Sequence, residues 1–206
     1  SGCDEANGGW YYDLKPNETY TTERAIYGIS TGGAEEATKE LIKFKRKDGI
    51  SWNNNGVPMI VFNDYMDCIW GNQEPSRILP LVDKASELGC EVFCIDGGWC
   101  TNLGDWEPQD YYKDCSLAEI ASIIKEKNMI PGIWFELEAC QSSTEGFKLG
   151  HDCVLRRYDS VIGEERAFYN FSNNEVRKYL TQKIERFYNM GYRYIKNDYN
   201  QSIGIG

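Results

Sequence analysis

Short apolar runs and amphipathic helical patterns alternate along the chain from about residue 57 onward. A strand–helix–strand order produces a parallel sheet with helices packed outside it, because parallel strands need a long crossover connection. Residues 140–165 fit neither pattern and are predicted to be irregular. Ser172 and Glu175 match a capping box at the start of the last helical pattern. The predicted strands cover residues 58–62, 91–95, 130–135 and 192–195, and the predicted helices cover residues 76–88, 117–127 and 172–190.

Every predicted strand ends in polar or aromatic side chains. In parallel α/β folds, both barrels and open sheets, the carboxyl ends of the strands form the edge at which active sites are built. Four strands that all deliver such groups to one edge therefore indicate a functional site there. The side chains concerned are Asn63, Asp64, Asp96, Trp99, Glu136, Glu138, Lys196 and Asp198.

The last strand carries Lys196, Asp198 and Asn200 at alternate positions. Alternate residues of a strand share a face, so the three side chains are expected to point the same way. A carboxylate beside an ammonium group stays ionised, which suits a nucleophile or a group that stabilises a cationic transition state. Taken alone, the same pattern is more typical of a surface salt bridge at a strand end.

The alternation of side chains on the two middle strands points to the same edge. Phe93 and Ile95 share the face expected to pack against the helices, which leaves Asp96 on the opposite face. Trp134 and Glu136 share one face of the next strand. We therefore expect Asp96, Trp134 and Glu136 to face a common axis, although a single Trp is as often an ordinary core residue.

Charge and composition narrow the class of protein. The formal net charge of -10 and the pI of about 4.7 argue against electrostatic binding of nucleic acid. Aromatic residues make up 14% of the chain, and aromatic rings in clefts commonly bind the faces of sugars. No apolar run is long enough to span a bilayer, and no leader pattern is present, so a cytoplasmic protein without membrane contact is expected.

The cysteines and the single histidine argue against several kinds of catalytic site. The eight cysteines show no paired metal-ligand spacing, and His151 is the one histidine of the chain. A Cys/His zinc site and a Ser-His-Asp triad are therefore both disfavoured. We expect reduced thiols and no cofactor or metal ion.

Residues 1–50 are predicted to form an arm and a linker helix rather than part of the main unit. Glycine and proline interrupt the first 33 residues, whereas Ala37, Leu41 and Phe44 form one apolar stripe of a helix over residues 34–46. The chain is thus divided into an N-terminal arm with its helix, residues 1–50, and a main unit, residues 51–206.

Four motifs in this order resemble the α-galactosidases, or melibiases, of glycoside hydrolase family 36. The resemblance covers roughly residues 25–200. Each motif is weak alone, but the ordered set is fairly specific. The motifs are Ile95-Asp96-Gly97-Gly98-Trp99, Leu103-Gly104-Asp105-Trp106, Gly132-Ile133-Trp134-Phe135-Glu136-Leu137-Glu138 and Ile195-Lys196-Asn197-Asp198-Tyr199-Asn200.

The resemblance implies a fold, a reaction and a set of residues. The fold is a (β/α)8 barrel of the TIM type behind an N-terminal β-sandwich, to which residues 1–50 would be the tail. The reaction is hydrolysis of terminal α-linked galactose with retention, with Asp198 as the nucleophile. The substrate is a galactose-containing oligosaccharide. The residues expected to bind it are Asp96, Trp99, Trp106, Trp134, Arg166, Lys196 and Asn200.

The chain departs from the family pattern at three places. Gly97 stands where the family has the second carboxylate of an Asp-Asp pair, so one group that would hold sugar hydroxyls is absent. Asn197 replaces the Trp between Lys196 and Asp198. The Asn-Thr-Trp-Glu pattern of the first strand reads Asn63-Asp64-Tyr65-Met66 here.

The sequence stops after the fourth predicted strand, whereas an eight-stranded barrel needs about 250 residues. We therefore expect the first four β/α units of a barrel, with the acid/base carboxylate of the family lying outside this chain. The residues alone offer only Asp96, Asp105, Glu136 and Glu138 as carboxyl partners for the nucleophile. Open sheet edges favour a homo-oligomer or pairing with the missing barrel half.

Three other functions fit the same residues. The first is an α-N-acetylgalactosaminidase or a related α-glycosidase. The second is a non-catalytic sugar-binding or assembly fragment. The third is a metal-dependent hydrolase with Asp96, Glu136 and Asp198 as oxygen ligands.

Overall fold

The computed structural model describes residues 13–22, 25–47, 58–163 and 166–198. The described residues divide into two compact units, the smaller one from residues 13 to 59 and the larger one from residues 60 to 198. Residues 1–50 were predicted to form an arm and a linker helix, and that domain boundary stays a prediction. The candidate site lies entirely in the larger unit.

The smaller unit contains one helix, α1 (Ala34–Lys47). Acidic residues occupy its first turn and basic residues its last turn, which complements the helix dipole. Lys39 pairs with Glu35 at 2.9 Å, one turn away. The helix predicted over residues 34–46 is confirmed, although none of its residues is buried.

The larger unit is built on a parallel sheet of four strands in the order β1-β2-β3-β8. Each strand pairs in parallel with the one that precedes it in this order, and a helix connects each pair. The register aligns Cys94 with Gly132 and Gly132 with Tyr194, and Trp134 with Lys196. The predicted α/β fold with a parallel sheet is therefore confirmed. The strands are β1 (Val61–Asn63), β2 (Val92–Ile95), β3 (Ile130–Phe135) and β8 (Tyr194–Asn197).

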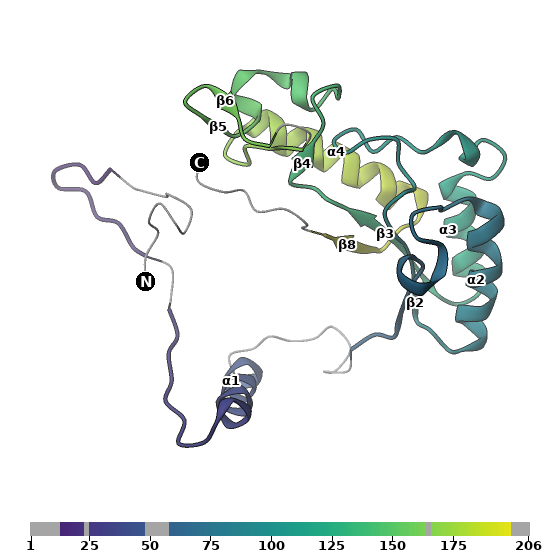
Figure 1. The fold of residues 1–206 in the computed structure, drawn as a ribbon, viewed down its shortest axis with the longest axis horizontal. Helices are drawn as coiled ribbons and strands as arrows, with labels where there is room; N and C mark the ends of the chain where they lie inside the picture. The colour runs from purple at the N-terminus through teal and green to yellow at the C-terminus, as the bar shows by residue number, and fades with distance from the viewer. Residues whose placement is uncertain (1–12, 23–24, 48–57, 164–165, 199–206) are drawn as a thin grey trace. The chain divides into compact units, whose positions relative to one another are not determined.

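The three connecting helices lie on one face of this sheet (Figure 1). They are α2 (Pro75–Glu87), α3 (Leu117–Glu126) and α4 (Asn174–Met190), close to the predicted bounds. The N-cap of α4 is Asn173, whose side chain accepts a hydrogen bond from the backbone N–H of Glu175 at 2.8 Å. Ser172 was predicted to be this cap, which is wrong. Its hydroxyl instead donates to Asn170 within the preceding turn.

The core lies between the sheet and the helices. Phe93 and Ile95 of β2 are fully buried and belong to the same cluster as the buried residues of all three helices, as their alternation predicted. Fully burying such a side chain contributes about 1.5–3 kcal/mol. Because Phe93 and Ile95 take the helix side, the next residue, Asp96, is placed on the other side at the strand end.

Residues 139–168 contain small antiparallel pairs, whereas residues 140–165 were predicted to be irregular and only a short β segment over residues 167–171 was expected. β4 (Ala139–Cys140) pairs with β7 (Ala167–Phe168), and β5 (Arg156–Arg157) pairs with β6 (Ser160–Val161) in a hairpin. Strands of two residues leave no periodic pattern in a sequence. Single helical turns complete the unit at η2 (Tyr65–Ile69), η3 (Asp110–Tyr112), η4 (Phe147–Leu149) and η5 (His151–Cys153).

Two findings concern the described residues as a whole. None of the helices within them has the length and apolar character needed to cross a bilayer. The seven cysteines described, which are all but Cys3, are free thiols.

Candidate active site

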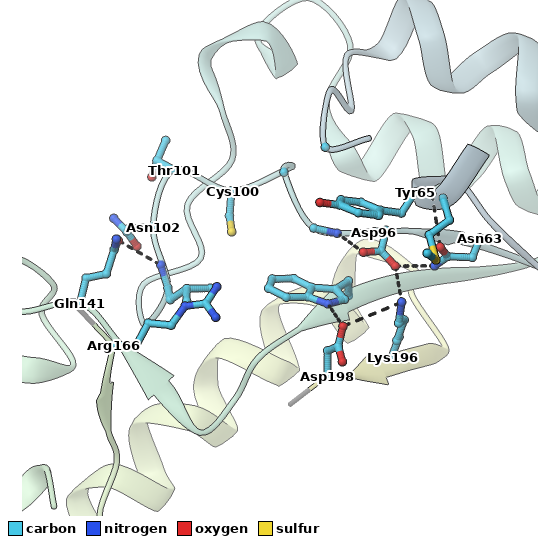
Figure 2. Close-up of a pocket in the computed structure, with 16 residues that line it drawn as sticks. Asn63, Tyr65, Asp96, Cys100, Thr101, Asn102, Gln141, Arg166, Lys196 and Asp198 are labelled. Carbon is cyan, nitrogen blue, oxygen red and sulfur yellow. Dashed lines mark hydrogen bonds and ion pairs between the residues drawn. The ribbon is translucent and has the colours of Figure 1, made fainter. Parts of the chain in front are cut away.

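An open cleft of about 840 Å³ lies at the carboxyl ends of the sheet strands (Figure 2). Three of its side chains lie within strands, namely Asn63 in β1, Trp134 in β3 and Lys196 in β8. Asp96 and Asp198 directly follow β2 and β8. All four strands of the parallel sheet thus contribute a side chain to one cavity. The register explains this convergence, because Trp134 pairs directly with Lys196 and Asp96 lies one residue beyond the end of β2.

Asp96 is the most constrained side chain of the cleft and is only 4% exposed. Its Oδ1 accepts a hydrogen bond from the backbone N–H of Gly97 at 2.7 Å. Its Oδ2 accepts from Asn63 Nδ2 at 2.5 Å and from Lys196 Nζ at 2.6 Å. Three donors from three chain segments therefore hold the carboxylate in one orientation before any ligand binds.

Lys196 lies between the two carboxylates of the cleft. Its Nζ is 2.6 Å from Asp96 Oδ2 and 4.0 Å from Asp198 Oδ2. Burial disfavours the ammonium form, but the hydrogen bond to Asp96 and the charges of both carboxylates outweigh it and raise the pKa of Lys196. The side chain is thus a permanent cation at neutral pH.

Asp198 is held by both its side chain and its backbone. Its Oδ2 accepts a hydrogen bond from Trp134 Nε1 at 3.0 Å, and its backbone N–H donates to the carbonyl of Phe135 at 2.7 Å. The side chain is 33% exposed, so the carboxylate is accessible from the cleft. An oriented and accessible carboxylate near an ammonium group has the properties of a nucleophile.

A second carboxyl group lies behind Asp96. Asp64 is fully buried, and its Oδ1 accepts from the backbone N–H of Asp96 at 2.8 Å and from Gln73 Nε2 at 3.0 Å. Burial is the main reason that its pKa is raised to about 6. Asp64 was predicted only as one polar residue among several at the strand ends. The structure makes it a support for the backbone that carries Asp96.

Glu136 is buried beneath Arg166 and does not line the cleft. Its exposed fraction is 1%, and its Oε2 lies 3.3 Å from Arg166 Nη2. Burial raises the pKa of Glu136, the guanidinium group of Arg166 opposes this, and the charge of Asp198 adds to the increase. Glu136 therefore does not line the cleft itself, and its orientation toward the common axis with Asp96 and Trp134 stays a prediction.

Five of the predicted site residues line the same cleft, namely Asp96, Trp134, Arg166, Lys196 and Asp198. Trp99 and Trp106 do not, and this corrects the expectation that they lie beside the sugar. Both rings are fully buried and pack edge-on against Phe135. Trp99 Nε1 donates to the backbone carbonyl of Trp134 at 2.9 Å, so it supports the cleft from below. Asn200 lies outside the described residues.

Several cleft residues were not among the predicted binding residues. Asn63 could have been chosen, because it directly follows a strand. The others come from loops after β1, β2 and β4, whose spacing carries no signal of a site. They include Tyr65, Cys100, Thr101, Asn102 and Gln141.

Within the described ranges, no group of three or more His, Cys, Asp or Glu side chains converges on a point where a metal ion could be held. Asp96 and Asp198 are instead joined through the ammonium group of Lys196. The ammonium group supplies positive charge between these two carboxylates, so the pair needs no metal ion to balance its charge. This arrangement disfavours the metal-dependent alternative.

Comparisons with known proteins find similarity to one enzyme family. A family model described as Melibiase matches residues 19–205. An α-galactosidase of Lactobacillus acidophilus is 24% identical over 98% of this chain and 29% of its own length. An α-galactosidase of Escherichia coli is 25% identical over 83% of this chain and 25% of its own length. The chain thus spans between a quarter and a third of the length of these relatives.

The solved structures that resemble this chain are also α-galactosidases. An α-galactosidase of Thermus thermophilus, in complex with p-nitrophenyl α-D-galactopyranoside, superposes with a TM-score of 0.63 at 27% identity. The match covers 69% of this chain and 31% of that one. A family 36 α-galactosidase of Geobacillus stearothermophilus has the same TM-score at 22% identity, over 72% of this chain and 22% of its own, and supports the fold alone.

Proposed function

The chain belongs to the melibiase family, and from this membership we propose that the protein containing it is a retaining glycoside hydrolase. Its substrate would be an oligosaccharide with a terminal α-linked galactose. The relatives named above are α-galactosidases, and one of them holds a galactoside. The observation that carries the proposal is the oriented carboxylate of Asp198, fixed by Trp134 and accessible from the cleft.

The proposed mechanism is a double displacement. In the first step Asp198 attacks the anomeric carbon, the glycosidic C–O bond breaks, and the leaving oxygen takes a proton from a carboxylic acid. In the second step the carboxylate left by that acid takes a proton from a water molecule, whose oxygen attacks the anomeric carbon of the glycosyl-enzyme and releases Asp198 as a carboxylate. The hydrogen bond from Trp134 orients the carboxylate of Asp198, and the ammonium group of Lys196 lies 4.0 Å from Asp198 Oδ2.

We propose that the terminal sugar lies over Asp96, Lys196 and Trp134. The carboxylate of Asp96 can accept hydrogen bonds from sugar hydroxyls, and the Lys196 ammonium group can donate to sugar oxygens. Arg166 borders the same cavity from the other side. Trp99 and Trp106 are left out of this subsite, because a sugar cannot reach their buried rings.

The acid of the first step is proposed to lie outside this chain. Asp105 is engaged by the hydroxyl of Tyr179 at 2.6 Å and by the backbone N–H of Glu145 at 3.0 Å. Glu136 is buried under Arg166, and Asp96 is fixed by three donors. These engagements favour a second possibility for the isolated chain, which is sugar binding without turnover.

We further propose that residues 51–206 are the first four β/α units of an eight-stranded TIM-type barrel, and that residues 1–50 are the tail of a preceding β-sandwich domain. The remaining strands would extend the sheet from β1 and β8, which are its outer strands. A homo-oligomer or pairing with the other barrel half would cover the same edges. A cytoplasmic location and a role in carbohydrate metabolism also remain predictions.

The nucleophile is tested by replacing Asp198 with Ala in the complete protein. We expect hydrolysis of a nitrophenyl α-galactoside to fall by at least about 10³-fold, because no covalent intermediate can form. Asp152→Ala, at an exposed side chain outside the cleft, is the matched control and should leave the rate unchanged. Near-normal hydrolysis by the Asp198→Ala protein would show that Asp198 is not the nucleophile.

A further inference from the structure

Asn197 lies between the two charged residues that the end of β8 contributes to the cleft. Side chains alternate along a strand, so Lys196 and Asp198 point into the cleft (Figure 2) and Asn197 points to the opposite face of the sheet. Asn197 is not one of the described residues that line the cleft. A sugar in the cleft therefore does not contact this side chain, and any effect of Asn197 on the chemistry acts through its neighbours.

Both ends of the Asn197 amide hold the segment that follows β3. Its Oδ1 accepts a hydrogen bond from the backbone N–H of Leu137 at 3.2 Å. Its Nδ2 donates to Glu138 Oε1 at 2.9 Å. These partners fix which end of the amide is the nitrogen. The two hydrogen bonds join the end of β8 to residues 137–138, and we call them the Asn197 clamp.

The segment that the clamp holds is itself anchored. The backbone carbonyl of Glu138 accepts from the backbone N–H of Tyr169 at 2.8 Å, and Tyr169 is only 2% exposed. The next residue, Ala139, pairs with Phe168 in the antiparallel ladder of β4 and β7. Residues 137–138 are therefore a fixed point to which the end of a neighbouring strand can be tied.

The end of β8 carries the carboxylate of Asp198 and is an outer part of the sheet. Among the described strands, β8 pairs with β3 alone. The backbone N–H of Asp198 donates to the carbonyl of Phe135 at 2.7 Å, and Trp134 Nε1 donates to its side chain at 3.0 Å. Strand ends at the edge of a sheet open more readily than buried strands. The clamp acts at the residue just before Asp198, so it restricts rotation of the peptide that carries the carboxylate.

Glu138 makes the clamp costly to break. Hydrogen bonds to a carboxylate are roughly twice as strong as bonds between neutral groups. The second oxygen of this side chain, Glu138 Oε2, is buried and has no hydrogen-bond partner among the described residues. The N–H of Asn197 is thus a donor that compensates a half-buried carboxylate for its lost hydration.

We propose that Asn197 is a positioning residue, which acts through its clamp on residues 137–138 and holds Asp198 in the orientation that attack on the anomeric carbon requires. This inference rests on the glycosidase function proposed above. It gives Asn197 no contact with the sugar and no part in proton transfer. Its signature is a slower chemical step at unchanged affinity for the sugar.

The test exchanges the donor and the acceptor of the clamp. Asn197→Asp keeps an oxygen for the N–H of Leu137 but sets a second carboxylate against Glu138. Glu138→Gln keeps an oxygen to which Asn197 can donate. In the double variant the new glutamine amide donates to the new aspartate, so the bond forms in the reverse direction. The matched control is Asn189→Asp, an exposed amide on α4, which adds the same charge outside the cleft.

Two quantities are measured on the complete protein. The rate of the first chemical step is followed by release of nitrophenol from nitrophenyl α-galactoside in a single turnover, with the enzyme in excess. The affinity and the number of binding sites for galactose are measured by calorimetry. A loss of folded protein would lower the number of galactose sites, whereas a misplaced nucleophile would not.

We expect Asn197→Asp to lower the single-turnover rate about tenfold, because a carboxylate displaced by a fraction of an ångström attacks more slowly. Glu138→Gln alone should lower the rate by up to about threefold, and the double variant should return to within about threefold of the wild type. The Kd for galactose should change less than about twofold in every variant, and the control should match the wild type. If Asn197→Asp fails to fold, Asn197→Ala, which removes both hydrogen bonds without adding a charge, should give the same tenfold loss at unchanged galactose affinity.

An unchanged rate in the folded Asn197 variant overturns the inference and leaves the proposed function standing. A loss of galactose affinity as large as the loss of rate also overturns it, because Asn197 would then act on sugar binding. The same holds for a defect that Glu138→Gln does not repair, since the effect would not pass through the clamp. If the wild-type protein releases no nitrophenol, the proposed function fails, and this inference fails with it.

Discussion

Asp64 is a carboxyl group without exposed surface, and it accepts the backbone N–H of Asp96. Its second oxygen, Oδ2, has no hydrogen-bond partner among the described residues. The ionised carboxylate of Asp64 is removed from water, and it is stabilised mainly by the two hydrogen bonds that Oδ1 accepts. The carboxyl group that orients the cleft backbone is therefore also a group whose ionised form destabilises the fold.

This gives a pH-dependent prediction for Asp64→Asn. The pKa of Asp64 is about 6 in the folded protein, whereas an aspartate outside the fold has a pKa of 3.8. The folded state therefore binds this proton more tightly, and stability falls as the pH rises from about 4 to about 6, by roughly 3 kcal/mol in total. Asn cannot ionise and keeps the oxygen that accepts from Asp96, so the variant should lack this loss.

The measurement is the free energy of unfolding by urea at several pH values between 4 and 7 for both proteins. Relative to the wild type, the variant should gain stability across this interval and then change no further above pH 7. Two curves that run parallel from pH 4 to pH 7 would show that Asp64 has an ordinary pKa. Differences between the two proteins cancel the titration of all other groups.

At this scale the sequence was most informative where a residue directly follows a strand. Asp96, Lys196 and Asp198 were predicted to share the cleft because strand alternation fixes their side, and they do. Trp99 was misplaced because it lies four residues past its strand, where a turn redirects the chain into the core. Gln141 carried no signal, because its place depends on a two-residue strand.

Helix α3 begins with the clearest local signal in the chain, although its cap was not among the predicted features. Ser116 Oγ accepts from the backbone N–H of Glu119 at 3.2 Å, and Glu119 Oε2 accepts from the backbone N–H of Ser116 at 2.7 Å. This is a capping box, which satisfies two backbone donors at the helix start. The Ser-x-x-Glu spacing would have located the helix start from sequence alone.

Replacing Ser116 with Ala should therefore lower the free energy of unfolding by about 1 kcal/mol. Ser122→Ala in the same helix is the control. Its hydroxyl donates to the carbonyl of Ala118 at an exposed position inside the helix, where Ala is the better helix former. Ser122→Ala should be neutral or slightly stabilising in the same urea titration. Equal losses from both substitutions would contradict a role for the cap.

The long elements were predictable because each has its own period. Strand β3 and the helices α2 and α3 were placed within about two residues, a normal uncertainty for helix and strand ends. The strands β4, β5 and β6 were missed, because two residues cannot show alternation, and the pairing of β7 was not predicted, because its partner is distant in sequence. Contacts between residues distant in sequence determine the conformation of such segments, and these contacts cannot be inferred from a single sequence.

On the scale of the whole molecule, the outer strands of the sheet are the least covered part of the fold. In the order β1-β2-β3-β8, β1 and β8 each have one strand neighbour among the described residues. Ile195 of β8 pairs with Ile133, which is fully buried, yet Ile195 is 40% exposed. An exposed apolar edge of this kind favours pairing with another chain or another segment. The net charge of -10 opposes such pairing through repulsion between copies.

We therefore predict that the 206-residue chain, studied by itself, associates with itself through the β8 edge. Light scattering should show a mass that rises with concentration, and more steeply at high salt, where repulsion between the acidic chains is screened. Ile195→Lys should shift the equilibrium toward the monomer, because it places a charge on the edge. The control is Leu149→Lys, since Leu149 is 41% exposed in the same unit but lies in η4. A monomer at every concentration and salt level would contradict association through this edge, as would an equal shift caused by both lysines.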